Sequence, residues 1–146
     1  MNDLSATVTA GQVPDTTIFE LLHAAQALED RVEAALQKAG LSTPKFSVLN
    51  ALVTSGEPLS LSELASRLSC VRSNMTQLVD RLETEGLVRR VDDPADRRIV
   101  KAAITETGRT KQAAGAERID ELHRDFAANV EEQDRLAFRR LLAALD

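Results

Sequence analysis

Apolar residues recur every three or four positions along most of this chain, which is the spacing that places them on one side of an α-helix. The first such segment begins at Thr17-x-x-Glu20, a capping-box pattern, and ends at Gly40, a residue that favours the left-handed conformation closing many helices. Its apolar positions are Ile18, Leu21, Leu22, Ala25, Leu28, Val32 and Leu36. The pattern predicts one long amphipathic helix, preceded by a flexible N-terminal tail over residues 1–15.

Two shorter helices are predicted next. The first starts at Thr43-Pro44, where the missing proline N–H costs nothing, and Gly56 with Pro58 ends it. The second starts at Ser60-x-x-Glu63, another capping box. Their inward positions are Phe46, Leu49, Leu52 and Val53 in the first, and Leu61, Leu64, Ala65 and Leu68 in the second.

A tight turn at Ser69-Cys70 leads into a fourth helix, from about Val71 to Glu85, which Gly86 closes. Its apolar positions are Met75, Leu78, Val79 and Leu82. Two short β-branched segments, residues 87–91 and 99–104, then flank a polar tip that contains Pro94. This alternation around a turn predicts a β-hairpin.

Two more helices complete the predicted fold. Thr105 caps the first of them, which carries Ala113, Ile119, Leu122 and Phe126. Asn129-x-x-Glu132 predicts the start of the second, with Phe138, Leu141, Leu142 and Leu145 facing inward. The predicted fold is therefore mainly α, with six helices and a two-stranded β-wing in the order α-α-α-α-β-β-α-α.

Composition limits the classes of protein that this can be. The chain has 146 residues, 43% hydrophobic and 28% charged, which fits one ordinary globular domain. No apolar segment approaches the roughly 18 residues that a membrane helix needs, and the N-terminus lacks the features of a secretory signal. A single cysteine allows no internal disulfide. We expect a soluble, cytoplasmic protein.

Charge is unevenly distributed. The net charge is −5, yet residues 60–111 hold ten Lys and Arg against eight Asp and Glu, a net +2. The rest of the chain therefore has a net charge of −7. A mildly basic centre flanked by acidic segments is compatible with local contact to phosphates.

The stretch from Ser60 to Ile104 carries the functional signal. A short capped helix, a turn and a longer amphipathic helix form a helix-turn-helix, whose second helix enters the DNA major groove. Away from its apolar side this helix offers side chains that recognise base edges: Arg72, Ser73, Asn74, Thr76 and Gln77. The alternative is an ordinary solvated helix face.

The hairpin tip, residues 92–98, supplies the second half of this signal. An arginine on such a wing can enter the neighbouring minor groove, where negative potential is concentrated. Asp96, two residues before Arg98, can hold that guanidinium in one orientation on an extended strand. The alternative is a solvated turn with a salt bridge.

These segments together resemble the multiple-antibiotic-resistance regulator (MarR) family of winged helix-turn-helix transcription regulators. The resemblance lies in Leu64-Ala65-Ser66-Arg67-Leu68, in residues 76–83 and 85–90, in the wing Asp93-Pro94-Ala95-Asp96-Arg97-Arg98, and in the closing residues 104–108. One departure concerns the turn before the fourth helix. The family commonly has Gly-Val-Ser there, whereas this chain has Ser69-Cys70-Val71, and a valine cannot cap the helix.

The resemblance implies a homodimer that binds a pseudo-palindromic operator in double-stranded DNA, represses transcription, and is released by a small anionic or phenolic effector. Residues 41–105 would form the DNA-binding region, and residues 16–40 and 106–146 a helical dimerisation region, within one compact domain. Arg98 would enter the minor groove, with Arg97 as the second candidate. The predicted DNA contacts are Arg72, Ser73, Asn74, Thr76, Gln77, Arg81, Asp96, Arg97 and Arg98.

Several residues allow competing interpretations. Cys70 is either a small packing residue in the turn or an accessory redox sensor, and the first interpretation is favoured because free cysteine behaves as a small hydrophobe. His23 and His123 could contribute to a metal site, but exposed or hydrogen-bonded histidines are far commoner. We predict no metal and no cofactor. No nucleophile–base pair or phosphate loop is evident, so we predict that the protein is not an enzyme. The alternative function is a winged-helix protein-interaction module without DNA binding.

Overall fold

The computed structural model describes residues 17–144 and divides into two compact units, Met1–Arg31 and Val32–Asp146. The predicted tail over residues 1–15 and the inward position of Leu145 lie outside the described residues. The described residues form six helices and three strands, so the mainly helical fold predicted from the sequence is confirmed.

The first helix, α1 (Thr17–Gln37), supplies all the described structure of the first unit. Thr17 is the first helical residue, whereas the capping-box pattern placed it just before the helix. The apolar stripe predicted along this helix is largely exposed in the single chain. Its exposed members in the first unit are Ile18, Leu22, Ala25 and Leu28, and Phe19, which lies outside the predicted stripe, is exposed as well.

The end of α1 belongs to the second unit, where hydrogen bonds attach it to its neighbours. Gly40 has φ +69°, the left-handed conformation predicted for the helix stop. The Glu33 carboxylate accepts hydrogen bonds from both the backbone N–H and the hydroxyl of Thr43, each at 2.7 Å. These bonds, the backbone one first, lower the pKa of Glu33. Lys111 donates through Nζ to the carbonyl oxygen of Ala39 at 2.9 Å, so the turn after α1 is attached to α5 as well.

The second and third helices follow their predicted signals closely. In α2 (Thr43–Ser55), Ser42 is the N-cap and Gly56 ends the helix with φ +71°. In α3 (Leu61–Arg67), the Ser60 hydroxyl accepts from the N–H of Glu63 at 3.2 Å, and the Glu63 carboxylate accepts from the N–H of Ser60 at 2.7 Å. The predicted capping box at Ser60 is therefore confirmed.

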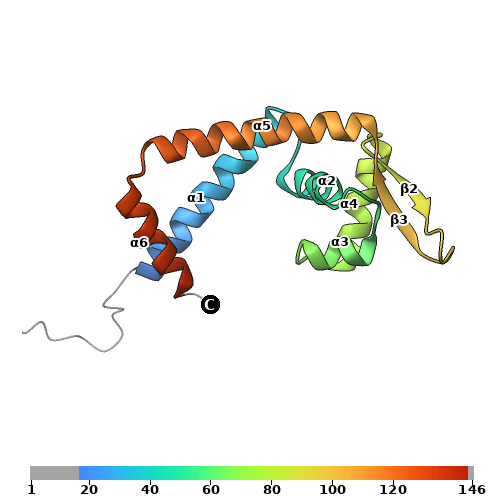
Figure 1. The fold of residues 1–146 in the computed structure, drawn as a ribbon, viewed down its shortest axis with the longest axis horizontal. Helices are drawn as coiled ribbons and strands as arrows, with labels where there is room; N and C mark the ends of the chain where they lie inside the picture. The colour runs from blue at the N-terminus through green and yellow to red at the C-terminus, as the bar shows by residue number, and fades with distance from the viewer. Residues whose placement is uncertain (1–16, 145–146) are drawn as a thin grey trace, which may run out of the picture. The chain divides into compact units, whose positions relative to one another are not determined.

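A three-stranded antiparallel sheet stands beside these helices, in the order β1-β3-β2. Figure 1 labels two of these strands, β2 and β3. The hairpin β2 (Val88–Asp92) and β3 (Val100–Ile104) was predicted, but β1 (Leu59–Ser60) was not. A strand of two residues has no alternation to detect. Leu59 is buried and pairs with Ala102 of β3, so tertiary packing creates this strand.

The core of the second unit joins α2, α3, the sheet and α4 (Arg72–Thr84). Three residues of α4 are fully buried, Met75, Val79 and Leu82, while Leu78 packs at the edge of the core. They meet residues of the other elements, of which the largest are Leu36, Leu49, Leu52, Leu59 and Leu64. Burial of each such side chain contributes roughly 1.5–3 kcal/mol, so this cluster fixes how α4 lies on its neighbours.

The last two helices are α5 (Glu106–Ala128) and α6 (Glu132–Ala143). The hairpin lies at the N-terminal end of α5, and α6 follows its other end (Figure 1). The cap predicted for α6 at Asn129 is wrong: Asn129 ends α5, and Glu131 with Asp134 forms the capping box of α6. The inward orientation predicted for three apolar residues of α6 is also wrong. These residues are 41–51% exposed in the single chain: Phe138, Leu141 and Leu142.

Gly108 marks a close approach between α5 and the sheet. Thr105 caps α5 by accepting from the N–H of Gly108 at 3.0 Å, and its own N–H donates to the carbonyl oxygen of Leu87 at 3.1 Å. A Cβ atom at Gly108 would lie 2.0 Å from that carbonyl oxygen and 2.8 Å from Cγ1 of Ile104. Because one of these atoms is backbone, the clash can be relieved only by moving the helix.

We therefore expect Gly108→Ala to lower the free energy of unfolding by about 1–3 kcal/mol, the usual cost of overpacking. Alanine is the better helix former by about 1 kcal/mol, so the steric effect must exceed this gain. Urea denaturation measures the difference. The control is Thr107→Ala, an exposed neighbour, for which we expect a change within about 0.5 kcal/mol. Equal stability of Gly108→Ala and the wild type would contradict the close approach.

Candidate nucleic-acid interface

The helix-turn-helix predicted from the sequence consists of α3, a four-residue turn (residues 68–71) and α4. Ser69 has φ +49°, and the N–H of Cys70 donates to the carbonyl oxygen of Ala65 at 2.9 Å. The Cys70 side chain is half-buried and packs against the hydrophobic core. This position favours the packing interpretation of Cys70 over the redox one.

The polar side of α4 is free of the core. Met75, Val79 and Leu82 take the inner face, and the outer face carries exposed side chains. The residues predicted to contact DNA from this helix are all among the exposed ones: Arg72, Ser73, Asn74, Thr76, Gln77 and Arg81. The Thr76 hydroxyl donates to the carbonyl oxygen of Arg72 at 3.1 Å, the usual i−4 bond of a helical threonine. The outer face can therefore meet a ligand without any rearrangement of the core.

Arg90 on β2 connects α4 to the hairpin. Its guanidinium forms ion pairs with both Asp80 and Glu83 of α4, and its N–H donates to Glu83 at 3.0 Å. The hydrogen bond that its guanidinium donates to Asp80, and after it the contact with Glu83, raises the pKa of Arg90. A second ion pair, Lys45 with Glu85, attaches α2 to the residue that ends α4. Helix α4 is thus held at both its inner face and its C-terminal half.

At the wing tip, Asp96 and Arg98 form the contact that their spacing suggested. Arg98 donates through Nε to Oδ1 and through Nη2 to Oδ2 of Asp96, both at 3.0 Å, and its backbone N–H donates to Oδ1 at 3.0 Å. These bonds, the side-chain ones first, lower the pKa of Asp96. The Arg98 side chain is nevertheless 89% exposed. A fixed yet accessible guanidinium is suited to an anionic partner.

Asp93 stabilises the base of the tip. Its carboxylate pairs with Lys101 at 2.8 Å and accepts from the N–H of Ala95 at 2.7 Å. The contact with Lys101 is the main cause of the lowered pKa of Asp93, and it raises the pKa of Lys101. Sequence reasoning did not assign roles to Asp93 and Lys101. The available signal was the Asp-Pro dipeptide, because an aspartate before proline favours a turn.

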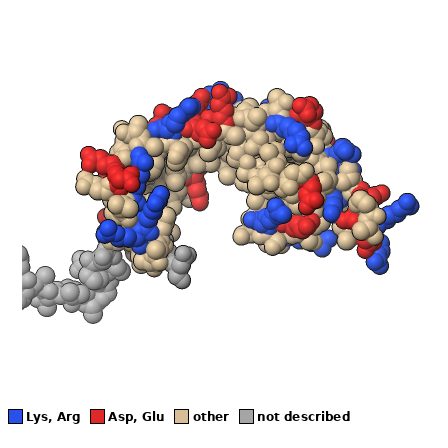
Figure 2. Space-filling view, viewed as in Figure 1, with Lys and Arg blue, Asp and Glu red and all other residues tan. Residues whose placement is uncertain are grey.

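A groove of about 600 Å³ lies between the start of α3, the start of α4 and the wing. Arg72 and Thr76 line it from α4, and Arg90, Arg98 and Ile99 line it from the hairpin. Lys and Arg side chains project at the hairpin end of the molecule, with Asp and Glu beside them (Figure 2). Of the nine predicted contact residues, three line this cleft, Arg72, Thr76 and Arg98. The other six are not part of its lining: Ser73, Asn74, Gln77, Arg81, Asp96 and Arg97.

Comparison with known proteins identifies the family. The model of the MarR family matches residues 41–100. The crystal structure of the transcriptional regulator BldR from Sulfolobus solfataricus has 31% sequence identity to this chain and a TM-score of 0.69, over 91% of this chain and 99% of BldR. The chain belongs to the MarR family.

Two further relatives bear on this assignment. CouR from Rhodococcus jostii RHA1, solved with p-coumaroyl-CoA bound, is 28% identical with a TM-score of 0.76, over 93% of this chain and 95% of CouR. YkoM of Bacillus subtilis, an uncharacterised helix-turn-helix regulator, is 41% identical over 47% of this chain and 44% of its own length. The chain spans about half the length of the curated relatives that it matches. MarR proteins are transcription regulators and not enzymes.

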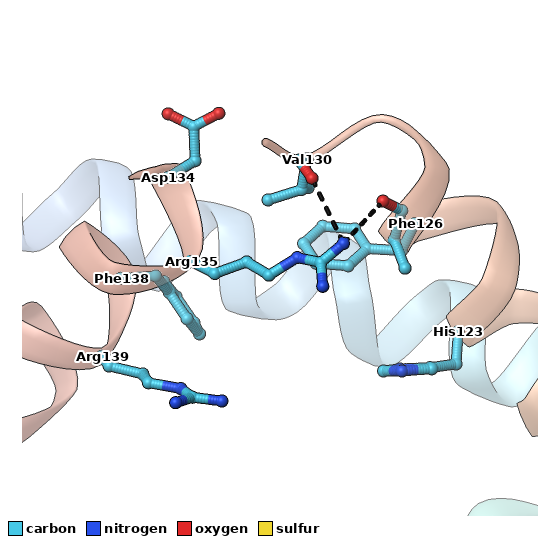
Figure 3. A pocket seen from close by; sticks show the side chains of 8 residues that line it. His123, Phe126, Val130, Asp134, Arg135, Phe138 and Arg139 are labelled. Atoms are coloured by element: carbon cyan, nitrogen blue, oxygen red, sulfur yellow. Dashed lines mark hydrogen bonds between the residues drawn. The ribbon is translucent and has the colours of Figure 1, made fainter. Parts of the chain in front are cut away.

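A second hollow of this MarR protein, about 480 Å³, lies between the end of α5 and α6 (Figure 3). The aromatic rings of Phe126 and Phe138 line it, together with His123 and Arg139. Arg135 also lines it, and its Nη2 donates to the carbonyl oxygens of Ala127 at 3.3 Å and Val130 at 3.4 Å.

No group of three or more His, Cys, Asp or Glu side chains in residues 17–144 is placed to hold a metal ion. Within the same range no helix has both the length and the hydropathy to cross a bilayer.

The lowered pKa values of Asp93 and Asp96 make the wing sensitive to acid. Because both pKa values are depressed by folding, the ion pairs contribute fully above the usual aspartate pKa of about 3.9 and are lost as the pH falls through the lower, folded values. We expect carboxyl ¹³C shifts of both residues to titrate with midpoints below about 3.9.

Two variants separate the two contacts. Lys101→Met should raise the midpoint of Asp93 and leave that of Asp96 in place, and Arg98→Ala should do the reverse. Midpoints that stay unchanged in both variants would contradict the assigned causes.

Proposed function

We propose that this protein regulates transcription by binding double-stranded DNA, with α4 in a major groove and the β2–β3 wing against the neighbouring minor groove. One observation carries the proposal. Arg72 and Thr76, which belong to the exposed face of α4, line the same cleft as the oriented guanidinium of Arg98. A helix of this kind enters the major groove, and a wing arginine is suited to the minor groove.

Individual roles follow from position. Arg72, Asn74 and Gln77 are proposed to read bases, since arginine pairs with guanine and the amides pair with adenine. The hydroxyls of Ser73 and Thr76 can form hydrogen bonds with bases or with phosphates. Arg81, farther along α4, is proposed to contact the DNA phosphate backbone. On the wing, Arg98 is the minor-groove residue, Asp96 orients it, and Arg97 is proposed to bind phosphate.

We further propose that two copies bind together. The helices outside the winged unit expose large apolar side chains that a single chain cannot cover, and such patches mark interaction surfaces. No described residue of α6 is buried. The exposed apolar residues are Ile18, Phe19, Leu22 and Leu28 of α1, Phe126 of α5, and Leu136, Phe138, Leu141 and Leu142 of α6. Dimerisation through residues 16–40 and 106–146 would bury them, and it would present two winged units to a pseudo-palindromic operator.

We propose that the protein represses transcription and that a small ligand relieves the repression. The proposed location is the cytoplasm, where bacterial chromosomal DNA is found. A dimer on an operator excludes other proteins from that stretch of DNA. The CouR structure contains p-coumaroyl-CoA, and this supports an anionic aromatic effector for its relative. An effector releases DNA only if it binds a DNA-incompetent state more tightly, so added p-coumaroyl-CoA serves as the first probe in the binding assay described next.

Selection of bound duplexes from a random pool tests the function. We expect an inverted repeat with half-sites about 10 bp apart, bound by two protomers. Affinity for it should fall by about 10³–10⁵ between roughly 50 and 200 mM salt, because about 6–10 phosphates are contacted. Absence of any duplex binding at low ionic strength would instead favour a winged-helix protein-interaction module.

The wing assignment is tested by Arg98→Ala. We expect it to weaken operator binding by about 1–3 kcal/mol at matched salt, the usual worth of a specific groove contact. The matched control is Arg124→Ala, which removes the same charge from an exposed position of α5 and should leave the affinity nearly unchanged. An equal loss in both variants would indicate a general charge effect and would contradict a specific role for Arg98.

A further inference from the structure

Val71 is an unusual residue for its place in the fold. It is the N-cap of α4, with extended backbone angles (φ −69°, ψ 136°), and its side chain makes no capping hydrogen bond. Serine, threonine, asparagine and aspartate are preferred at this position, because their side chains satisfy a free N–H of the first turn. This chain forgoes that stabilisation at the start of its recognition helix.

The Val71 side chain also contributes little to the core. It is 67% exposed, more than any other large apolar residue among the described residues of the second unit. The other exposed apolar residues of that unit include Ile99 and Val100 on the hairpin, and several on α5 and α6. A solvated isopropyl group that neither packs nor caps has no evident structural use.

The backbone around Val71 is nevertheless fixed. Its carbonyl oxygen accepts the first α4 hydrogen bond, from the N–H of Met75 at 3.1 Å, and Met75 is fully buried. A β-branched side chain has few rotamers, so the methyl groups of Val71 are held in place. The residue next to it, Arg72, lines the cleft between α4 and the wing.

We infer that Val71 is a specificity-determining residue that recognises a thymine through its C5-methyl group. The inference rests on the proposed DNA binding. The N-terminal residues of a recognition helix lie deepest in the major groove, and the thymine methyl is the only apolar group that a base pair presents there. Asn74, three residues along the same helix, is of the type that pairs with adenine, so the methyl belongs to a thymine in or beside that base pair.

The test uses the selected operator with thymine replaced by deoxyuridine, which removes only the methyl group. Each thymine is replaced in turn, in both half-sites together. For the wild type, we expect one position at which the replacement weakens binding by about four-fold per half-site, which corresponds to burial of one methyl group. For Val71→Ala, the same replacement should change binding less than two-fold.

Two further variants separate recognition from a structural role. Val71→Ser should raise the Tm, since serine can cap α4, while sensitivity to deoxyuridine at that position is lost. Ile99→Ala removes another exposed apolar side chain, one that lines the cleft beside Arg72, and it should keep the sensitivity.

The outcomes are distinguishable. If Val71→Ala and the wild type respond alike to every replacement, or no thymine position affects the wild type, the role of Val71 is wrong while DNA binding stands. If the protein binds no duplex at all, the proposed function itself fails.

Discussion

Anchoring of α4 is the constraint on which the rest of the structure depends. Met75, Val79 and Leu82 insert into a core shared with α2, α3 and the sheet, and this burial leaves one face of α4 in solvent. The ion pairs of Arg90 with Asp80 and Glu83 then hold the same helix to β2. Non-directional packing alone would allow the helix to slide, whereas charged groups at defined positions fix its register against the hairpin. The outer face of α4 and the wing are therefore presented as one rigid surface.

Two acidic residues stabilise the wing tip, although this region is proposed to bind DNA, which is itself negatively charged. Asp96 and Asp93 each neutralise one neighbouring cation, yet each also accepts backbone hydrogen bonds that shape the tip. The Arg98 side chain stays 89% exposed, because the carboxylate engages only two of the three guanidinium nitrogen atoms. The loss of net positive charge lowers long-range attraction to DNA. In return the guanidinium arrives already oriented, which reduces the entropy lost on contact.

Local signals in the sequence predicted most of the fold, and long-range contacts account for what was missed. The caps at Ser60 and Thr105 and the helix stops at Gly40 and Gly56 act within a few residues, so the pattern alone revealed them. The strand β1 forms only because Leu59 meets Ala102, and no local signal encodes such a pairing. Helical periodicity also predicted which residues of α4 are exposed to solvent. The ion pair of Asp80 with Arg90 joins α4 to β2, and the pattern of residues along one helix gives no sign of such a partner.

The unbroken length of α5 has a mechanical consequence. Its first turn is wedged against the carbonyl oxygen of Leu87 at Gly108, and Lys111 attaches it to the turn that follows α1. From there α5 continues to Ala128, a helix of 23 residues, or about 34 Å at 1.5 Å per residue. A tilt of about 5° at one end of such a rod displaces the other end by roughly 3 Å. Because α5 is anchored beside the hairpin, such a tilt would move the end next to α6 most, and it would couple the position of α6 to the hairpin through one unbent helix.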